Sequence, residues 1–125
     1  MEKKTETKEK ISKPEQLAIH IKSNKVVVIK ISASWCGPCK NKQFLGEYHN
    51  LKNAWASIPG VKFIELDVDA DESILSDKSY YDIEVDSVPS FLISKNGSFT
   101  RKYSGTNYLE SIHKYITESI STSGN

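Results

Sequence analysis

The chain has 125 residues, of which 38% are hydrophobic and 26% charged, with a formal net charge of +1 at pH 7. This length is enough for one domain with a single core, and the balanced charge gives no reason to expect nucleic acid or an anionic membrane as a partner. No stretch reaches the roughly 18 apolar residues that span a bilayer, and the charged start MEKKTETKEK lacks the apolar segment of a signal peptide. We therefore expect a monomeric cytoplasmic protein with one domain at residues 11–120, between flexible tails at 1–10 and 121–125.

The first half of this domain predicts a helix, a buried strand and a second helix. PEQLAIHIK (14–22) has the spacing of a short amphipathic helix with a proline in its first turn. KVVVIKI (25–31) is apolar at positions of both parities, which is typical of a strand buried on both faces. Large apolar residues then recur at helical spacing, which predicts a helix over 37–55 with Gly46 as a weak point.

The second half of the domain predicts a strand, a helix, a hairpin and a last helix. VKFIELDVDA (61–70) has the composition of a second central strand, and residues 71–83 predict a helix that opens on an acidic turn. Two apolar runs flank KNGS in residues 89–104, and Asn-Gly between such runs indicates a tight antiparallel hairpin. With a final helix at 107–120, the elements predict an α/β fold with a central mixed sheet, helices on both faces and an antiparallel C-terminal hairpin.

The two cysteines of the chain, Cys36 and Cys39, lie where the first strand gives way to the following helix. A structural disulfide closing so short a loop contributes only about 2 kcal/mol in the chain-entropy model and is rare in a reducing compartment. Zinc needs two more ligands, and the histidines at 20, 49 and 113 are scattered without ligand spacing. Redox chemistry explains the pair best, and we expect no metal site.

Their position gives the two cysteines different roles. Unpaired N–H groups and the positive end of a helix dipole favour a thiolate at Cys36, which we expect to be the nucleophile. Cys39 follows one helical turn later, and we expect it to be more buried and to attack the mixed disulfide that Cys36 forms. Gly37 allows tight backbone geometry between them, and Pro38 fixes φ in the first turn.

Here the sequence resembles the thioredoxin family over residues 11–120. WCGPCK matches the active-site motif of thioredoxins, and SVPS places Val88 and Pro89 where the family has a cis-proline facing the cysteines. Gly105 stands where the family has a glycine bordering the substrate groove. The resemblance implies the thioredoxin fold, with Trp35, Val88, Pro89 and Gly105 forming an apolar client-binding surface around the reactive sulfur.

The same resemblance implies a protein disulfide reductase, an electron carrier with no cofactor of its own. Its partners would be disulfide-containing clients and a thioredoxin reductase, through which NADPH acts indirectly. Two alternatives stay open at this point. One is a disulfide oxidase or isomerase, which Gly-Pro between the cysteines disfavours, and the other is a non-catalytic thioredoxin-like subunit of a larger assembly.

The chain departs from the family pattern beneath the cysteines. Lys30 stands where thioredoxins usually have a buried aspartate that helps move the proton of the second cysteine, and Glu65 stands where the family commonly has a lysine. A buried ammonium needs a partner, because an uncompensated buried charge costs several kcal/mol. We therefore expect Lys30 and Glu65 to form a charge-swapped pair with Glu65 as the proton relay. The alternative is that Lys30 extends its amine to the strand end while Glu65 faces solvent.

Overall fold

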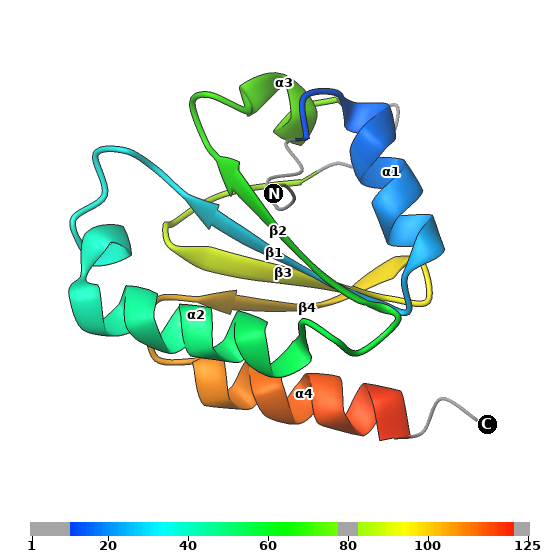
Figure 1. Cartoon of the computed structure of the whole chain (residues 1–125). Helices are drawn as coiled ribbons and strands as arrows, with labels where there is room; N and C mark the ends of the chain where they lie inside the picture. Colours follow the sequence, from blue (N-terminus) through cyan, green and yellow to red (C-terminus); the bar gives the residue numbers. More distant parts are fainter. Residues whose placement is uncertain (1–10, 78–82, 122–125) are drawn as a thin grey trace, which may run out of the picture.

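A computed structural model describes residues 11–77 and 83–121 of the chain (Figure 1). None of its helices in these two ranges is long and apolar enough to cross a bilayer. The elements follow in the order α1 (Pro14–Ser23), β1 (Val26–Ser32), the 3₁₀ helix η2 (Pro38–Lys40), α2 (Lys42–Trp55), β2 (Val61–Asp67), α3 (Glu72–Leu75), β3 (Ser90–Lys95), β4 (Ser98–Ser104) and α4 (Leu109–Ser121).

The strands form one mixed sheet with the order β2-β1-β3-β4. β1 and β2 are parallel, β3 is antiparallel to β1, and β4 is antiparallel to β3. The hairpin between β3 and β4 turns at Asn96 and Gly97, both of which have positive φ, as its Asn-Gly sequence predicts. The central strand β1 is buried along nearly its whole length, which confirms the expectation from its apolar composition.

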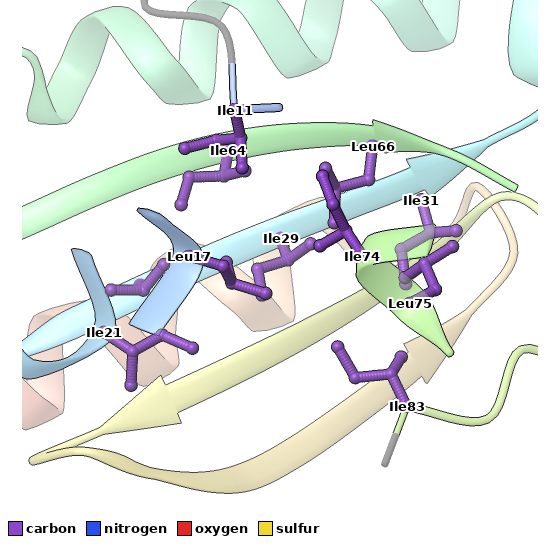
Figure 2. Close-up of a cluster of buried hydrophobic side chains, with 11 residues drawn as sticks. Ile11, Leu17, Ile21, Ile29, Ile31, Ile64, Leu66, Ile74, Leu75 and Ile83 are labelled. Carbon is purple, nitrogen blue, oxygen red and sulfur yellow. The ribbon is translucent and has the colours of Figure 1, made fainter. Parts of the chain in front are cut away.

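Helices cover both faces of this sheet (Figure 1), with α1 and α3 on one face and α2 and α4 on the other. The side chains of β1 alternate between the two cores because successive residues of a strand point to opposite faces. Val27, Ile29 and Ile31 pack with Leu17 and Ile21 of α1 and with the two buried side chains of α3 (Figure 2). Val26 and Val28 pack on the other face, so Lys30 lies on the face covered by α2 and α4.

The helix predicted over 37–55 is interrupted, and this part of the prediction is wrong. Residues 38–40 form a 3₁₀ turn, and Asn41 then adopts an extended conformation (φ −60°, ψ 128°) before α2 begins at Lys42. The Asn41 side chain accepts a hydrogen bond from the backbone N–H of Phe44 at 3.0 Å, which caps α2. The cysteines therefore precede the α-helix, and the helix runs through Gly46 to Trp55.

Two boundaries also differ from the sequence expectation. A helix was predicted over 71–83, but in the described part of this range only residues 72–75 are helical. Residues 78–82 lie outside the part of the chain that the structure describes. Ser121, placed in the C-terminal tail by the sequence, closes α4, and its hydroxyl donates to the Glu118 carbonyl. The remaining tail residues, 1–10 and 122–125, lie outside the described residues, so the flexibility predicted for them stays a prediction.

Candidate redox site

Cys36 and Cys39 are joined by a disulfide, with 5.3 Å between their Cα atoms. The backbone N–H of Cys39 donates to the Cys36 sulfur at 3.2 Å, and the N–H of Cys36 donates to the Ala33 carbonyl at 3.1 Å. Both cysteines are buried, at 4% and 6% exposure. The expectation that Cys39 is the more buried of the two is therefore wrong. The N–H of Cys39, aimed at the Cys36 sulfur, favours a thiolate there once the disulfide is reduced.

The chain around the disulfide is fixed by the end of β1 and by the 3₁₀ turn. After Ser32 the backbone leaves the sheet, and Ala33 packs with both cysteines in a small buried cluster. Gly37 and Pro38 between the cysteines are exposed, and Pro38 begins the turn, where its missing N–H is not needed. The exposed Gly-Pro pair leaves room for a second polypeptide to approach the buried sulfurs.

The segment before β3 completes one side of the site. The Val88–Pro89 peptide bond is cis, as the resemblance implied. Val88 packs against the cluster of Ala33 and the two cysteines, which brings this loop to the disulfide. Gly105 has a φ of +106°, and its N–H donates to the Pro89 carbonyl at 2.8 Å. This hydrogen bond ties the end of β4 to the cis-proline loop.

Trp35 forms an exposed wall next to the disulfide. Its side chain is 67% exposed, and the indole N–H donates to the Asp69 carboxylate at 2.8 Å. Val68, the residue before Asp69, packs against the cysteine cluster. Neither Val68 nor Asp69 was predicted from the sequence to belong to the site. Their position directly after β2 was the available signal, because β1 and β2 are parallel and their carboxyl ends meet at one edge of the sheet.

Lys30 and Glu65 are register partners on neighbouring strands, but Glu65 makes its closest contacts elsewhere. The Glu65 carboxylate accepts from the Lys52 ammonium at 2.8 Å and from the Tyr48 hydroxyl at 3.0 Å. The Lys30 ammonium lies over the Tyr48 ring, 4.4 Å from its centroid, and Lys30 is only 8% exposed. The ion pair of Glu65 is thus with Lys52. The Lys30 ammonium interacts with Glu65 through the attraction of their charges and with the face of the Tyr48 ring through a cation–π contact.

The charges of this cluster are shifted by burial and by one another. Burial lowers the pKa of Lys30, an effect that the negative charge of Glu65 opposes and the positive charge of Lys52 reinforces. Burial alone would raise the pKa of Glu65, but the hydrogen bond and charge of Lys52, the Tyr48 hydroxyl and the charge of Lys30 lower it overall. Burial raises the pKa of the Tyr48 hydroxyl, and Glu65 raises it further. At neutral pH the cluster holds an ionised Glu65 between a neutral phenol and two amines.

The fold and the paired cysteines define a thiol–disulfide oxidoreductase. The family model for thioredoxin matches residues 8–118. Over 104 residues the chain is 36% identical to thioredoxin from Mus musculus, which covers 82% of this chain and 88% of that protein. The human thioredoxin is 36% identical over 93 residues, covering 74% of this chain and 78% of the human protein. The chain belongs to the thioredoxin family.

Solved structures agree with this assignment. The oxidized form of mitochondrial thioredoxin 3 from Saccharomyces cerevisiae superimposes with a TM-score of 0.69 at 28% identity, covering 87% of this chain and 92% of that one. Thioredoxin from Malassezia sympodialis gives a TM-score of 0.68 at 28% identity and covers 87% of each chain. The thioredoxin fold predicted from the sequence, with its mixed sheet and antiparallel C-terminal strands, is confirmed.

Proposed function

We propose that this oxidoreductase works as a protein disulfide reductase in which Cys36 is the nucleophile and Cys39 the resolving thiol. The observation that carries the proposal is the Cys36–Cys39 disulfide, placed between an exposed Trp35 and the cis Val88–Pro89 bond. Gly37 and Pro38 leave the sulfurs approachable from one side. Trp35, Val88 and Gly105 supply the surface on which an extended client segment lies, and Pro89, which was expected to be part of that surface, is fully buried and supports the loop from beneath.

Reduction of a client proceeds in two exchanges. The Cys36 thiolate attacks one client sulfur, the client S–S bond breaks, and the leaving client thiolate takes up a proton. Cys39 then loses its proton and attacks the Cys36 sulfur, so that the Cys36–Cys39 bond forms and the second client thiolate leaves. The client gains two electrons and the protein is oxidised to the disulfide. A flavoenzyme thioredoxin reductase that uses NADPH restores the dithiol.

The first experiment measures reduction of insulin disulfides with dithiothreitol as the electron source. Wild-type protein is compared with Cys36→Ser and Cys39→Ser, and folding of each variant is checked by circular dichroism. With dithiothreitol we expect turnover above the uncatalysed rate only in the wild type. When the pre-reduced Cys39→Ser variant is incubated with insulin without dithiothreitol, we expect it to stop as a mixed disulfide with the client. A folded wild-type protein without turnover would contradict the proposal and favour a non-catalytic subunit.

We further propose that Lys30 and Glu65 support the resolving step, with Glu65 accepting the Cys39 proton through water. Glu65 fits this role because it is ionised, and its side chain is 45% exposed, so it exchanges protons with solvent. Lys30 and Lys52 keep the carboxylate ionised at neutral pH, so it is free to accept a proton, and its lowered pKa favours passing that proton on to solvent. The positive charge of Lys30 occupies the position where the family pattern has an aspartate.

This role of Glu65 is separated from its structural contacts by a matched pair of variants. Glu65→Gln removes the proton acceptor, whereas Lys52→Gln removes the 2.8 Å ion pair and leaves the Glu65 carboxylate in place. We expect Glu65→Gln to slow insulin reduction about ten-fold or more and to change its pH profile, as is typical for loss of a proton acceptor. Lys52→Gln keeps the carboxylate, whose pKa Tyr48 and Lys30 still lower, so this variant should lose less activity than Glu65→Gln. Equal turnover in the wild type and in Glu65→Gln would remove Glu65 from the mechanism.

The proposal includes a setting and a set of partners. We place the protein in the cytoplasm, because both of its cysteines belong to the redox site and neither forms a structural disulfide of the kind that secreted proteins carry. We expect it to act there as a monomeric electron carrier. Its partners are disulfide-bonded client proteins and the reductase, without nucleic acid or membrane. A reduced thiol pair in cytoplasmic extracts, trapped by rapid alkylation, would support this placement, and a predominantly oxidised pair would contradict it.

A further inference from the structure

A groove of about 570 Å³ lies directly beside the disulfide. Trp35, Val68 and Val88 line its end nearest the cysteines, and Val68 and Val88 also pack against the cysteine cluster. Leu75 of α3 and Val85 of the loop before β3 extend its apolar lining away from the disulfide. The groove is therefore continuous with the surface on which we place the client, and it lies between α3 and the cis-proline loop.

The charged residues that line this groove are acidic. The charged side chains of its lining, within the part of the chain that the structure describes, are Glu72 and Asp86, both exposed. Lys102 donates to Asp86 at 3.1 Å, so Asp86 is partly neutralised and Glu72 carries the greater share of the uncompensated charge. In the sequence, residues 65–86 contain nine of the sixteen acidic residues of the chain and only one of its seventeen lysines and arginines.

Other carboxylates of this acidic segment have structural tasks. Asp69 holds the Trp35 indole, and Asp67 accepts hydrogen bonds from the backbone N–H groups of Asp69 and Ala70. Asp71 is 7% exposed and accepts from the Asp67 N–H at 2.8 Å. Glu72, in contrast, is at the first position of α3 and faces the groove as an exposed carboxylate. Its charge is available to a bound molecule.

We propose that this groove selects clients in which an apolar side chain and a lysine or arginine lie within a few residues of the reacting cysteine. The inference rests on the proposed disulfide reductase function and names its client class. A compact space of about 570 Å³ is about 8 Å across, a length that an extended peptide covers in two or three residues at about 3.3 Å per residue. The apolar side chain fills the groove, and the cation faces Glu72 and Asp86 at its rim.

The selectivity has a definite size and a definite salt dependence. Exposed ion pairs change equilibrium constants by roughly 1.5- to 5-fold, and a like charge in the same place disfavours binding by a similar factor. We therefore expect a lysine-containing client to be reduced about 3- to 10-fold faster, in kcat/KM, than the same client with glutamate. The ratio should fall toward one at high salt, because exposed charges are screened.

The test uses three symmetric peptide disulfides that differ at one position each. The first has leucine and lysine beside its cysteine, the second has glutamate in place of lysine, and the third has serine in place of leucine. Reduction is followed with dithiothreitol, and the uncatalysed rate is subtracted for each peptide. We expect the first peptide to have the highest kcat/KM, and the other two to be slower through loss of charge attraction and of apolar burial, respectively.

Variants assign the charge preference to the groove. Glu72→Gln should reduce the ratio between the lysine and glutamate peptides, and Glu72→Lys should invert it. Lys102→Gln frees Asp86 and should increase the ratio. Glu47→Gln is the matched control, because Glu47 is an exposed glutamate on α2, on the opposite face of the sheet, and its ratio should equal that of the wild type.

The outcomes separate this inference from the function on which it rests. Equal rates for the lysine and glutamate peptides, or a ratio that Glu72→Lys leaves unchanged, would overturn the client preference while insulin reduction still supports the reductase. Failure of the wild type to reduce either insulin or any peptide would overturn the reductase function and this inference together.

Discussion

At the scale of single residues, the contact between Trp35 and Asp69 holds the exposed wall of the site in place. A side chain that is 67% exposed is ordinarily mobile, and the charge-assisted hydrogen bond at 2.8 Å restrains the indole. Replacing Asp69 with alanine should therefore release the indole and lower kcat/KM for clients a few-fold, with little change in stability. The test is the indole N–H signal of Trp35 in a ¹⁵N–¹H NMR spectrum together with insulin reduction. An unchanged indole signal would show that Asp69 does not hold the ring.

The backbone of Gly105 has a φ of +106°, which is a conformation that residues other than glycine rarely adopt. A Cβ added there meets no atom within 4 Å, so any loss of stability comes from the backbone and not from a clash. We expect Gly105→Ala to lower the free energy of unfolding by about 1–2 kcal/mol. Gly37→Ala is the matched control, since Gly37 has a φ of −60° and equally open surroundings. Urea denaturation of the disulfide forms should leave Gly37→Ala near wild type, and equal losses in both variants would contradict the backbone explanation.

At the scale of elements, the separation of the cysteine turn from α2 depends on Asn41. Its side chain caps the Phe44 N–H, and its extended backbone divides the 3₁₀ turn from the helix. Asn41→Ala should cost about 1 kcal/mol of stability, whereas Asn41→Asp keeps a capping oxygen and should cost little. Thermal unfolding of the two variants measures the difference. A stability of Asn41→Ala equal to that of Asn41→Asp would show that the cap does not stabilise α2.

The outline of the fold could be predicted because its elements have strong local patterns. The apolar run of β1, the Asn-Gly turn between β3 and β4 and the periodicity of α4 each determine their element with little help from tertiary contacts. The break at Asn41 was missed because periodicity continues across it, although asparagine before Lys42 is a readable capping signal. The short α3 was overextended because an acidic, cap-like start indicates where a helix begins and not where it ends.

The candidate site was predictable where one short motif contains the residues and much less so where contacts cross elements. The redox pair follows from the short spacing of Cys36 and Cys39, and the cis Val88–Pro89 bond was implied by the family resemblance of SVPS. The bond from Trp35 to Asp69 joins residues 34 positions apart, and the partner of Glu65 is Lys52 on α2. Which residues become partners depends on the lengths of their side chains and on the position of α2 above the sheet. No local sequence pattern contains this information.

At the scale of the whole molecule, the two faces of the sheet have different electrostatic character. The groove beside α3 is acidic at its rim, and the opposite face holds the buried amine of Lys30 under α2. A charged amine at 8% exposure destabilises the fold even over the Tyr48 ring, because its lost hydration exceeds the stabilisation that the ring and the charge of Glu65 provide. The molecule therefore carries a buried cation on the face of the sheet that α2 covers, at a cost in stability that has a measurable pH dependence.

The pH dependence follows from the lowered pKa of Lys30, which burial causes against the opposing charge of Glu65. Between this lowered value and the ordinary value of 10.5, the unfolded chain binds more protons than the folded chain, so stability from this group rises with pH. Below the window the cost of burying the charge is fully present. Lys30→Met, which keeps the length of the side chain without its charge, should therefore be more stable than wild type at pH 7 by about 1 kcal/mol or more.

That advantage of Lys30→Met should shrink as the pH rises through the alkaline window, because the wild type then buries a neutral amine. Denaturant unfolding of both proteins in the disulfide form, from pH 7 to about pH 10, measures the difference directly. Lys62→Met on β2 is the control, because Lys62 is more exposed than Lys30, and its difference from wild type should not follow the Lys30 window. A Lys30→Met advantage that is constant with pH would mean that Lys30 is not a buried titrating cation, and the electrostatic role given to it beside Glu65 would then have no basis.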